Sequence, residues 1–208
     1  GVFSSMLGVS TTQIFIFLVF GAMLSTLKGG DFFLNWANSG FGRARGGPAK
    51  VSVFGSALFG SISGSAVANV VGTGTITIPM MKRVGYNPED AGAVEAVAST
   101  GGMIMPPVMG SASFLMAEIT GCSYWEVCMM SLIPVILYYL TLYLAVDLKA
   151  RRKNLHGLPE SEIPNGMKLL KEAGWIYIPP LLLLLFLLSV LQISANKACL
   201  FTCVLLLV

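Results

Sequence analysis

Small hydroxyl residues and glycines gather at two places within otherwise apolar sequence. The first run extends from Gly60 to Thr75, and the second from Ser99 to Met103, just before a pair of prolines. Hydroxyl and backbone carbonyl oxygens of this kind suit a hard cation, which prefers oxygen ligands. Irregular backbone survives at membrane depth only where it is buried in protein or lines a cavity. Broken helices in such sequence indicate the binding site of a transporter, so we expect the two runs to meet.

The candidate residues divide by the ligand that each could serve. Half-helix C-termini present carbonyl oxygens to a cation, whereas half-helix N-termini present donors to an anion. For the cation we expect oxygens from Ser61, Ser63, Gly64, Asn69, Ser99, Thr100, Gly101, Gly102 and Met103, the last three through their carbonyls. For the substrate we expect Ser63, Ser65, Asn69, Thr73 and Thr75. The alternative is that these small residues only let helices approach closely.

Glu95 is a carboxylate well inside an apolar segment, four residues before Ser99 and therefore on the same helix face. Ionisable residues at such depth are functional candidates, so Glu95 is a candidate for coupling to ion movement. It also lies only about two turns from the start of its helix, so it could instead reach interfacial water or pair with Lys82 or Arg83. The sequence leaves both interpretations open. Three other carboxylates stand at segment ends, where we expect them to be solvated: Glu118, Glu126 and Asp147.

The composition places all of these residues in a membrane. The 208 residues are 55% hydrophobic and 11% charged, whereas a soluble domain carries roughly 25% charged residues. The net charge of +3 is small and dispersed, which excludes a nucleic-acid surface and is typical of loop charges that set topology. The cysteines are interpreted as small membrane-helix residues rather than disulfide partners or metal ligands: Cys122, Cys128, Cys199 and Cys203.

The apolar runs predict an all-α integral membrane protein. In residues 1–50 we expect a first transmembrane helix and an amphipathic interfacial helix over 31–39. Phe32, Phe33, Trp36 and Ala37 share one face of that helix, and Asn35, Asn38 and Ser39 face away. Further segments are a re-entrant hairpin at 51–83, a discontinuous transmembrane helix at 84–121, a transmembrane helix at 122–153, a cytoplasmic loop at 154–174, and at 175–208 a transmembrane helix followed by the start of the next.

The hairpin is predicted from charge and length. Between basic clusters at 43–50 and 82–83, residues 51–81 carry no charge. One helix would put the clusters on opposite sides of the membrane, whereas the positive-inside tendency favours one side for both. As a helix, residues 48–63 would span about 24 Å, which is short of a hydrocarbon core of about 30 Å. A tip near Gly64 satisfies both constraints; the alternative is one full span and a buried loop.

Five stretches resemble a known family: Gly-Gly-Asp-Phe-Phe at 29–33, Arg-Gly-Gly-Pro-Ala-Lys at 45–50, Gly-Ser-Ile-Ser-Gly-Ser-Ala-Val-Ala-Asn-Val-Val at 60–71, Ile-Pro-Met-Met-Lys-Arg-Val-Gly-Tyr at 78–86, and Val-Glu-Ala-Val-Ala-Ser-Thr-Gly-Gly-Met-Ile-Met-Pro-Pro at 94–107. The chain resembles the large membrane subunit of tripartite ATP-independent periplasmic (TRAP) transporters, and most closely the fused permeases that work with TAXI-type binding proteins. The likeness is strong over residues 8–121 and elsewhere is one of hydropathy.

The resemblance implies an elevator-type, sodium-coupled importer of an organic anion in a bacterial or archaeal inner membrane. It implies two inverted repeats, each with a re-entrant hairpin and a broken helix, of which this chain, as an internal piece, would hold mostly the first. The implied partners are a TAXI-type periplasmic binding protein, a small membrane subunit or its fused equivalent, membrane lipid and a carboxylate substrate. The dicarboxylate branch tends to have a serine after the paired prolines, where this chain has Val108.

Two other classes of function compete with this interpretation. The Ser-Gly-Ser run at 63–65 would suit an intramembrane serine hydrolase, but no histidine or lysine at membrane depth could activate a serine, and His156 lies in a polar loop. We therefore expect no enzyme activity. A cation channel would also use broken helices and carbonyl oxygens, but it would carry flux without a binding protein.

Overall fold

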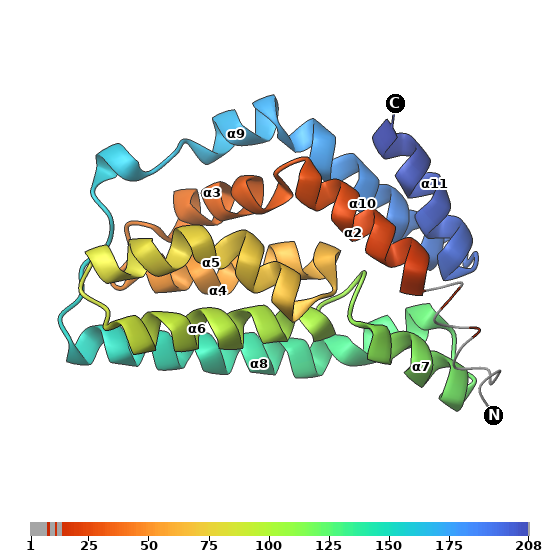
Figure 1. Ribbon diagram of the computed structural model, residues 1–208, viewed down its shortest axis with the longest axis horizontal. Helices are drawn as coiled ribbons and strands as arrows, with labels where there is room; N and C mark the ends of the chain where they lie inside the picture. Colours follow the sequence, from red (N-terminus) through yellow and green to blue (C-terminus); the bar gives the residue numbers. More distant parts are fainter. Residues whose placement is uncertain (1–7, 9–10, 12–13, 208) are drawn as a thin grey trace.

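The computed structural model describes residues 8, 11 and 14–207, which form helices and no strand (Figure 1). In chain order the helices are α2 (Phe15–Thr26), α3 (Gly29–Phe41), α4 (Gly47–Ser63), α5 (Ala66–Arg83), α6 (Pro88–Gly101), the 3₁₀ turn η2 (Gly102–Ile104), α7 (Ser111–Thr120), α8 (Tyr124–Arg152), the 3₁₀ turn η3 (Glu160–Glu162), α9 (Gly166–Glu172), α10 (Gly174–Ser189) and α11 (Ala195–Leu207). The expectation of an all-helical protein is confirmed for these residues.

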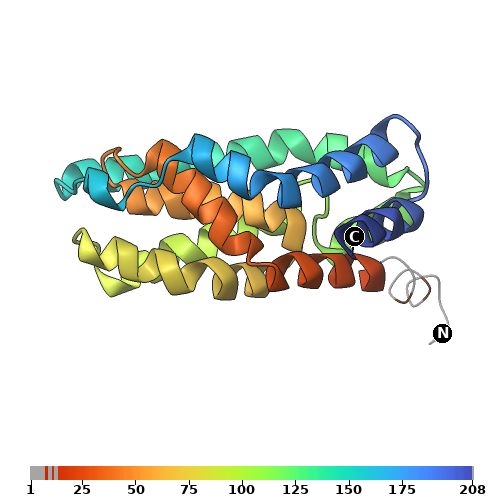
Figure 2. The same cartoon turned by 90° about the horizontal axis from the view of Figure 1, so that it is seen from above.

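Helices α4 and α5 form an antiparallel hairpin that turns at Gly64 and Ser65. Gly64 has a φ of +58°, which favours glycine. A Cβ atom at Gly64 would also lie 2.0 Å from the carbonyl oxygen of Met109, so no larger residue fits there. Ser65 caps the start of α5, because its hydroxyl accepts a hydrogen bond from the Ala68 N–H at 3.3 Å. The two arms lie side by side along the molecule (Figures 1 and 2).

The segment after the hairpin is interrupted. Helix α6 begins after Asn87, with Pro88 in its first turn, and continues into η2. Residues 105–110 are not helical, and α7 then extends beyond the hairpin tip (Figure 1). Two prolines in the gap lack the N–H that a continuing helix requires. Gly110 precedes α7, and its N–H donates to the Met103 carbonyl at 2.6 Å. The gap therefore forms a compact loop beside the hairpin tip.

Helix α8 is the one described helix that is long and apolar enough to cross a membrane by itself. Two bent pairs raise the number of candidate spans to three if each pair counts as one: α2 with α3, which meet at 66°, and the segment from Glu160 to Glu172 with α10, at 62°. In the core, α4 is covered by α3, α5, α6 and α8 and also contacts α2. Helix α11 packs against both α2 and α10 at one end of the molecule (Figure 1).

Helix α3 differs from the expected interfacial helix. It packs along α4, and Asn38 is 6% exposed rather than facing away from the apolar side. The Asn38 side-chain amide donates to the Glu162 carbonyl at 3.2 Å, because the segment between α8 and α9 covers this face. The prediction for Asn38 is wrong for that reason. The loop predicted at 154–174 also contains η3 and α9, the latter capped by the Asn165 side chain.

Asp147 is not solvated, although it stands near the end of α8. Its side chain is 16% exposed, and one carboxylate oxygen lies 2.6 Å from the ammonium group of Lys50, which is itself 5% exposed. The prediction for Asp147 is wrong because the start of α4 packs against α8, which buries Lys50 and leaves Asp147 only partly exposed. Glu118 and Glu126 are exposed. All four cysteines are free thiols.

Candidate ion and substrate site

Glu95 is fully buried in a cage of hydroxyl groups. We call this set of six residues from α4, α5 and α6 the hydroxyl cage: Glu95, Ser52, Ser56, Thr73, Thr77 and Ser99. One carboxylate oxygen, Oε1, accepts from Thr73 at 2.5 Å, Ser99 at 3.1 Å and Ser56 at 3.2 Å. The other, Oε2, accepts from Thr77 at 2.5 Å and Ser52 at 2.7 Å. Every residue of the cage is completely buried.

The cage follows from one spacing repeated on three helices. Ser52 and Ser56 are four residues apart on α4, as are Thr73 and Thr77 on α5 and Glu95 and Ser99 on α6. Residues at this spacing lie on one helix face, one turn apart. Gly74 leaves room for the carboxylate, because a Cβ atom there would lie 3.1 Å from Glu95 Cγ. Three helices thus each turn a pair of polar groups toward one point.

Among the described residues, Glu95 neither pairs with Lys82 or Arg83 nor reaches the surface. Lys82 and Arg83 are exposed at the end of α5, and Arg83 pairs with Glu162 at 3.1 Å. Among the described residues, the groups that bond Glu95 are the cage hydroxyls. Both the pairing and the contact with interfacial water are therefore wrong, and Glu95 is a buried group. An ionised carboxylate in such surroundings is costly unless hydrogen bonds or a cation compensate it.

Asn69 connects the cage with the interrupted helix. It is fully buried, and its side-chain amide donates to the Ser56 carbonyl at 2.8 Å and the Ser99 carbonyl at 3.5 Å. Beside it, α4 touches residues 101–110, which we call the break, and no side chain lies between the two backbones. A Cβ atom at Gly60 would lie 2.4 Å from the Cα of Gly102. The hairpin and the break are therefore in direct backbone contact, as the two glycine-rich runs suggested.

A pocket of about 300 Å³ lies at the hairpin tip, and we call it the tip pocket. Ser63, Gly64 and Ser65 line it from the hairpin, opposite residues of α2, the break and α7. The Val108 N–H donates to the Ser61 carbonyl at 3.1 Å, which holds the break against the tip. The Ser63 hydroxyl is buried without a hydrogen-bond partner. A donor in that state is available to a ligand.

The predicted site residues fall into three groups. Asn69, Thr73, Ser99 and Gly102 belong to or adjoin the hydroxyl cage with Glu95, whereas Ser61, Ser63, Gly64, Ser65 and Met103 surround the tip pocket or hold its wall. Thr75 and Thr100 lie outside both, on exposed faces of α5 and α6, and the Thr100 hydroxyl donates to the Ala96 carbonyl at 2.8 Å. The Ser61 hydroxyl donates to the Leu58 carbonyl at 2.7 Å within α4. Ser61 therefore contacts the break through its backbone carbonyl, which accepts from the Val108 N–H.

Gly101 serves close packing. A Cβ atom there would lie 2.5 Å from the ring of Tyr138 and 2.8 Å from that of Tyr139. The hydroxyls of these two tyrosines donate to the Val97 and Ala98 carbonyls, at 2.7 and 3.0 Å. Helix α8 thus satisfies carbonyls just before the end of α6.

Sequence reasoning missed three members of the cage, namely Ser52, Ser56 and Thr77. They stand in regular helix rather than beside glycine or proline, so a search for broken backbone passes over them. Their signal is the four-residue spacing, which matches that of Glu95 and Ser99.

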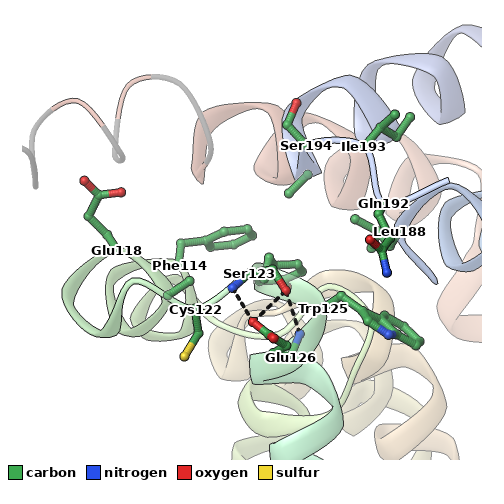
Figure 3. Close-up of a pocket in the computed structure, with 13 residues that line it drawn as sticks. Phe114, Glu118, Cys122, Ser123, Trp125, Glu126, Leu188, Gln192, Ile193 and Ser194 are labelled. Atoms are coloured by element: carbon green, nitrogen blue, oxygen red, sulfur yellow. Dashed lines mark hydrogen bonds between the residues drawn. The ribbon is translucent and has the colours of Figure 1, made fainter. Parts of the chain in front are cut away.

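A second pocket, of about 480 Å³, lies between the α7–α8 turn and the α10–α11 turn (Figure 3). The Glu126 carboxylate in its wall accepts from the Ser123 N–H at 2.7 Å and the Ser123 hydroxyl at 3.0 Å, which is a capping box at the start of α8. The pocket shares Phe114 with the tip pocket but no residue of the hairpin. It is therefore separate from the hydroxyl cage.

A helical chain with candidate membrane spans, a hairpin and a broken helix that meet at a buried polar centre has the architecture of a membrane permease. Residues 2–208 match the family described as the tripartite ATP-independent periplasmic transporter, DctM component, and the chain belongs to this family. The resemblance to the TRAP large membrane subunit is thereby confirmed.

Three curated relatives are similar to the chain. The C4-dicarboxylate TRAP transporter large permease protein DctM of Vibrio cholerae is 32% identical over 159 residues, which are 76% of this chain and 35% of that protein. The sialic acid TRAP transporter permease protein SiaT of Haemophilus influenzae is 26% identical over 168 residues, 81% of this chain and 27% of that protein. The isethionate TRAP transporter permease protein DctMQ of Oleidesulfovibrio alaskensis is 28% identical over 153 residues, which are 73% of this chain and 24% of that protein. The chain thus spans well under half of each relative.

Proposed function

We propose that the chain is part of the permease subunit of a sodium-coupled secondary transporter that imports an organic anion delivered by a periplasmic binding protein. The relatives are named for C4-dicarboxylates, sialic acid and isethionate, all of which are organic anions. The observation that carries the proposal is the direct contact between hairpin tip and broken helix, with a pocket beside it. We propose a carboxylate as the substrate and a TAXI-type binding protein as the partner.

The tip pocket has the electrostatics that an anion requires. The start of α5, capped by Ser65, and the start of α7 at Ser111 both line it. Helix N-termini carry a partial positive charge and free N–H donors, which favour an anionic group. The Ser63 hydroxyl adds a donor. A substrate carboxylate placed here would be held without a buried cationic side chain.

Sodium would bind at the opposite helix ends. Helix α4 ends at Ser63 and α6 at Gly101, so both present their last carbonyls toward the tip and the break. Helix C-termini favour a cation. We propose that the ion draws on carbonyl and hydroxyl oxygens from the predicted set on either side of the contact, with Ser63 and Gly64 from the hairpin and Gly101 to Met103 from the break.

The charged end of the helices supports a membrane orientation. The start of α4, the end of α5, the start of α6 and the end of α8 lie together at one end of the molecule (Figure 1). There Asp90 binds Lys149 at 2.5 Å and Lys153 at 2.8 Å, and these bonds hold the pKa of the Asp90 carboxyl below its usual range. We propose that this end faces the cytoplasm, so that the hairpin is re-entrant in a multi-pass inner-membrane protein. The remainder of the permease, including an inverted second repeat, and a small membrane subunit would complete an elevator-type transporter.

The test is uptake by the full-length permease, reconstituted with its small subunit and binding protein in liposomes. Radiolabelled succinate, N-acetylneuraminate and isethionate serve as probes under an inward sodium gradient. Ser63→Leu and Ser65→Leu place side chains in the tip pocket and should abolish uptake, whereas Thr141→Leu on the exposed face of α8 should not.

Each outcome has a distinct meaning. Wild-type uptake that requires both sodium and the binding protein supports the proposal. Uptake unaffected by leucine at both tip serines would count against the tip pocket as the substrate site. Flux in the absence of the binding protein would favour a channel, and no uptake of any probe would contradict a permease for these anions.

A further inference from the structure

We propose that Tyr124 is a positioning residue of the substrate site, because its hydroxyl group holds two carbonyl oxygens of the break and so fixes one wall of the tip pocket. Tyr124 acts through its neighbours and does not itself line that pocket. The inference rests on the proposed function, since it concerns the pocket proposed for the substrate carboxylate. It adds a residue from α8, a helix that supplies none of the predicted site residues.

The first argument is the hydrogen bonding of Tyr124. Its hydroxyl lies 2.6 Å from the Val108 carbonyl oxygen and 2.8 Å from that of Pro107, and it shares its single proton between the two. Among the described residues, Tyr124 is the donor to the Val108 carbonyl, and the Pro107 carbonyl has besides Tyr124 the weak Cys128 thiol at 3.9 Å. An unpaired carbonyl away from water is costly, so Tyr124 determines where both oxygens point.

Val108 is thereby held on both sides of its backbone. Its N–H donates to the Ser61 carbonyl at 3.1 Å, and its own carbonyl accepts from Tyr124. Val108 is 2% exposed and Met109 is 4% exposed, and both line the tip pocket together with Gly64. The position of this wall therefore depends on one bond to the hairpin and one bond to Tyr124.

The second argument is the packing of the Tyr124 ring. It is stacked on Phe114, with ring centroids 4.5 Å apart and an interplanar angle of 3°, and it is tilted against Phe17 at 5.9 Å. Phe17 and Phe114 both line the tip pocket, whereas Tyr124 lies behind them and lines the second pocket. Tyr124 thus contacts three residues of the tip pocket, namely Phe17, Phe114 and Val108, without entering it.

The start of α8 determines where Tyr124 stands. Ser123 is the N-cap, and its capping box with Glu126 closes the first turn of the helix. Tyr124 is the first residue of α8, and it shares a helix face with Val127 and Cys128, which are 4% and 1% exposed. The hydroxyl is therefore carried by a capped and packed helix end, which is more precise than a loop.

The third argument is charge. A carbonyl oxygen carries partial negative charge and repels an anion, whereas the N–H groups at the starts of α5 and α7 attract one. With both oxygens bonded to Tyr124, Pro107 and Val108 present no bare carbonyl to the tip pocket. Without the hydroxyl, these oxygens would be free to turn toward a bound carboxylate. Loss of the hydroxyl should therefore weaken substrate binding.

The experiment measures substrate binding to the purified full-length permease with its small subunit, in buffer that contains sodium. Succinate, N-acetylneuraminate and isethionate are titrated separately, and the rise of Tm with concentration gives Kd. For the probe that the wild type binds, we expect Tyr124→Phe to raise Kd about five-fold, which corresponds to the loss of one hydrogen bond.

Tyr177→Phe is the matched control. Tyr177 is 6% exposed, close to the 8% of Tyr124, and its hydroxyl donates to the Leu27 carbonyl, which does not belong to the tip pocket. Each variant loses one bond from a buried tyrosine to a carbonyl, so without probe both should unfold at similar temperatures, slightly below the wild type. Tyr177→Phe should keep the wild-type Kd, because its lost bond does not position the wall.

Every outcome separates positioning from folding and from the proposed function. An unchanged Kd in Tyr124→Phe, or an equal rise of Kd in Tyr177→Phe, would overturn the inference and leave the proposed function standing. Failure of Tyr124→Phe to assemble would overturn it as well, because Tyr124 would then serve folding. Uptake by a wild type whose Tm no probe raises would also overturn it, since the tip pocket would hold no substrate. Absence of both binding and uptake in the wild type would overturn the function itself.

Discussion

Replacement of Gly60 by alanine tests the backbone contact on which the site depends. The new Cβ would lie 2.4 Å from the Cα of Gly102 and 2.9 Å from the side-chain nitrogen of Asn69. Carbon atoms in contact lie about 3.5–4.0 Å apart, so α4 and η2 would have to separate by roughly 1 Å or more. Gly92→Ala is the matched control, since a Cβ on that glycine of α6 meets nothing within 4 Å.

The magnitude follows from three contributions. Over-packing of a filled interior costs about 1–3 kcal/mol, and disturbing the 2.8 Å bond from Asn69 to the Ser56 carbonyl costs about 1 kcal/mol. Alanine returns up to about 1 kcal/mol as the better helix former. We therefore expect Gly60→Ala to be destabilised by about 1–3 kcal/mol, whereas Gly92→Ala is neutral or slightly stabilised.

The assay is thermal unfolding of the purified full-length permease together with substrate uptake. Gly60→Ala should unfold at a lower temperature and transport more slowly than both the wild type and Gly92→Ala. Equal stability and equal transport in the two alanine variants would refute the reasoning, because the helices would then have room that the structure denies them.

Three further predictions concern the turn and the charged end. Gly64→Ala should block assembly, because a Cβ there meets the Met109 carbonyl at 2.0 Å and the φ of +58° is strained for alanine; normal yield in a membrane-expression assay would contradict this. Asp147→Leu leaves buried Lys50 unpaired and should cost about 3–5 kcal/mol, most of which the added change Lys50→Met restores, as a double-mutant cycle of unfolding would measure. The ion pairs of Asp90 lower its pKa in the folded protein, so they stabilise the fold above the unfolded-state pKa of about 3.9, and this stabilisation is lost as the pH falls through the folded-state pKa. Asp90→Asn should therefore flatten the acid side of a plot of stability against pH. An unchanged plot would show that these ion pairs do not contribute to stability.

The sequence predicts those parts of the site that are marked by a local residue type, such as glycine or proline. Glycine and proline interrupt helices by local chemistry, so the turn at Gly64 and the gap before Gly110 stand where the sequence has such residues. Composition alone was enough to predict a membrane protein, because a chain surrounded by lipid carries far more apolar and fewer charged residues than a soluble one. The family match supports the class, while the branch of the family and the ligand sets stay predictions.

Burial of polar residues was harder to predict, since it depends on which element covers them. Nothing local to Asn38 shows that the segment before α9 lies over it, and nothing local to Asp147 shows that Lys50 approaches from α4. The cage hydroxyls Ser52 and Thr77 lie in unbroken helix, where serine and threonine are common. Only when three helices are placed around Glu95 does the repeated four-residue spacing acquire a meaning.

The bare crossing of Gly60 and Gly102 also restricts how such a protein can diversify. The two backbones are in direct contact, so a larger side chain at either glycine would require the other helix to move away. The partly exposed residues around the tip pocket, such as Met103 and Ser111, instead face the pocket rather than another backbone. New cargo preferences should therefore arise by exchange of that lining, while the crossing itself is inherited unaltered.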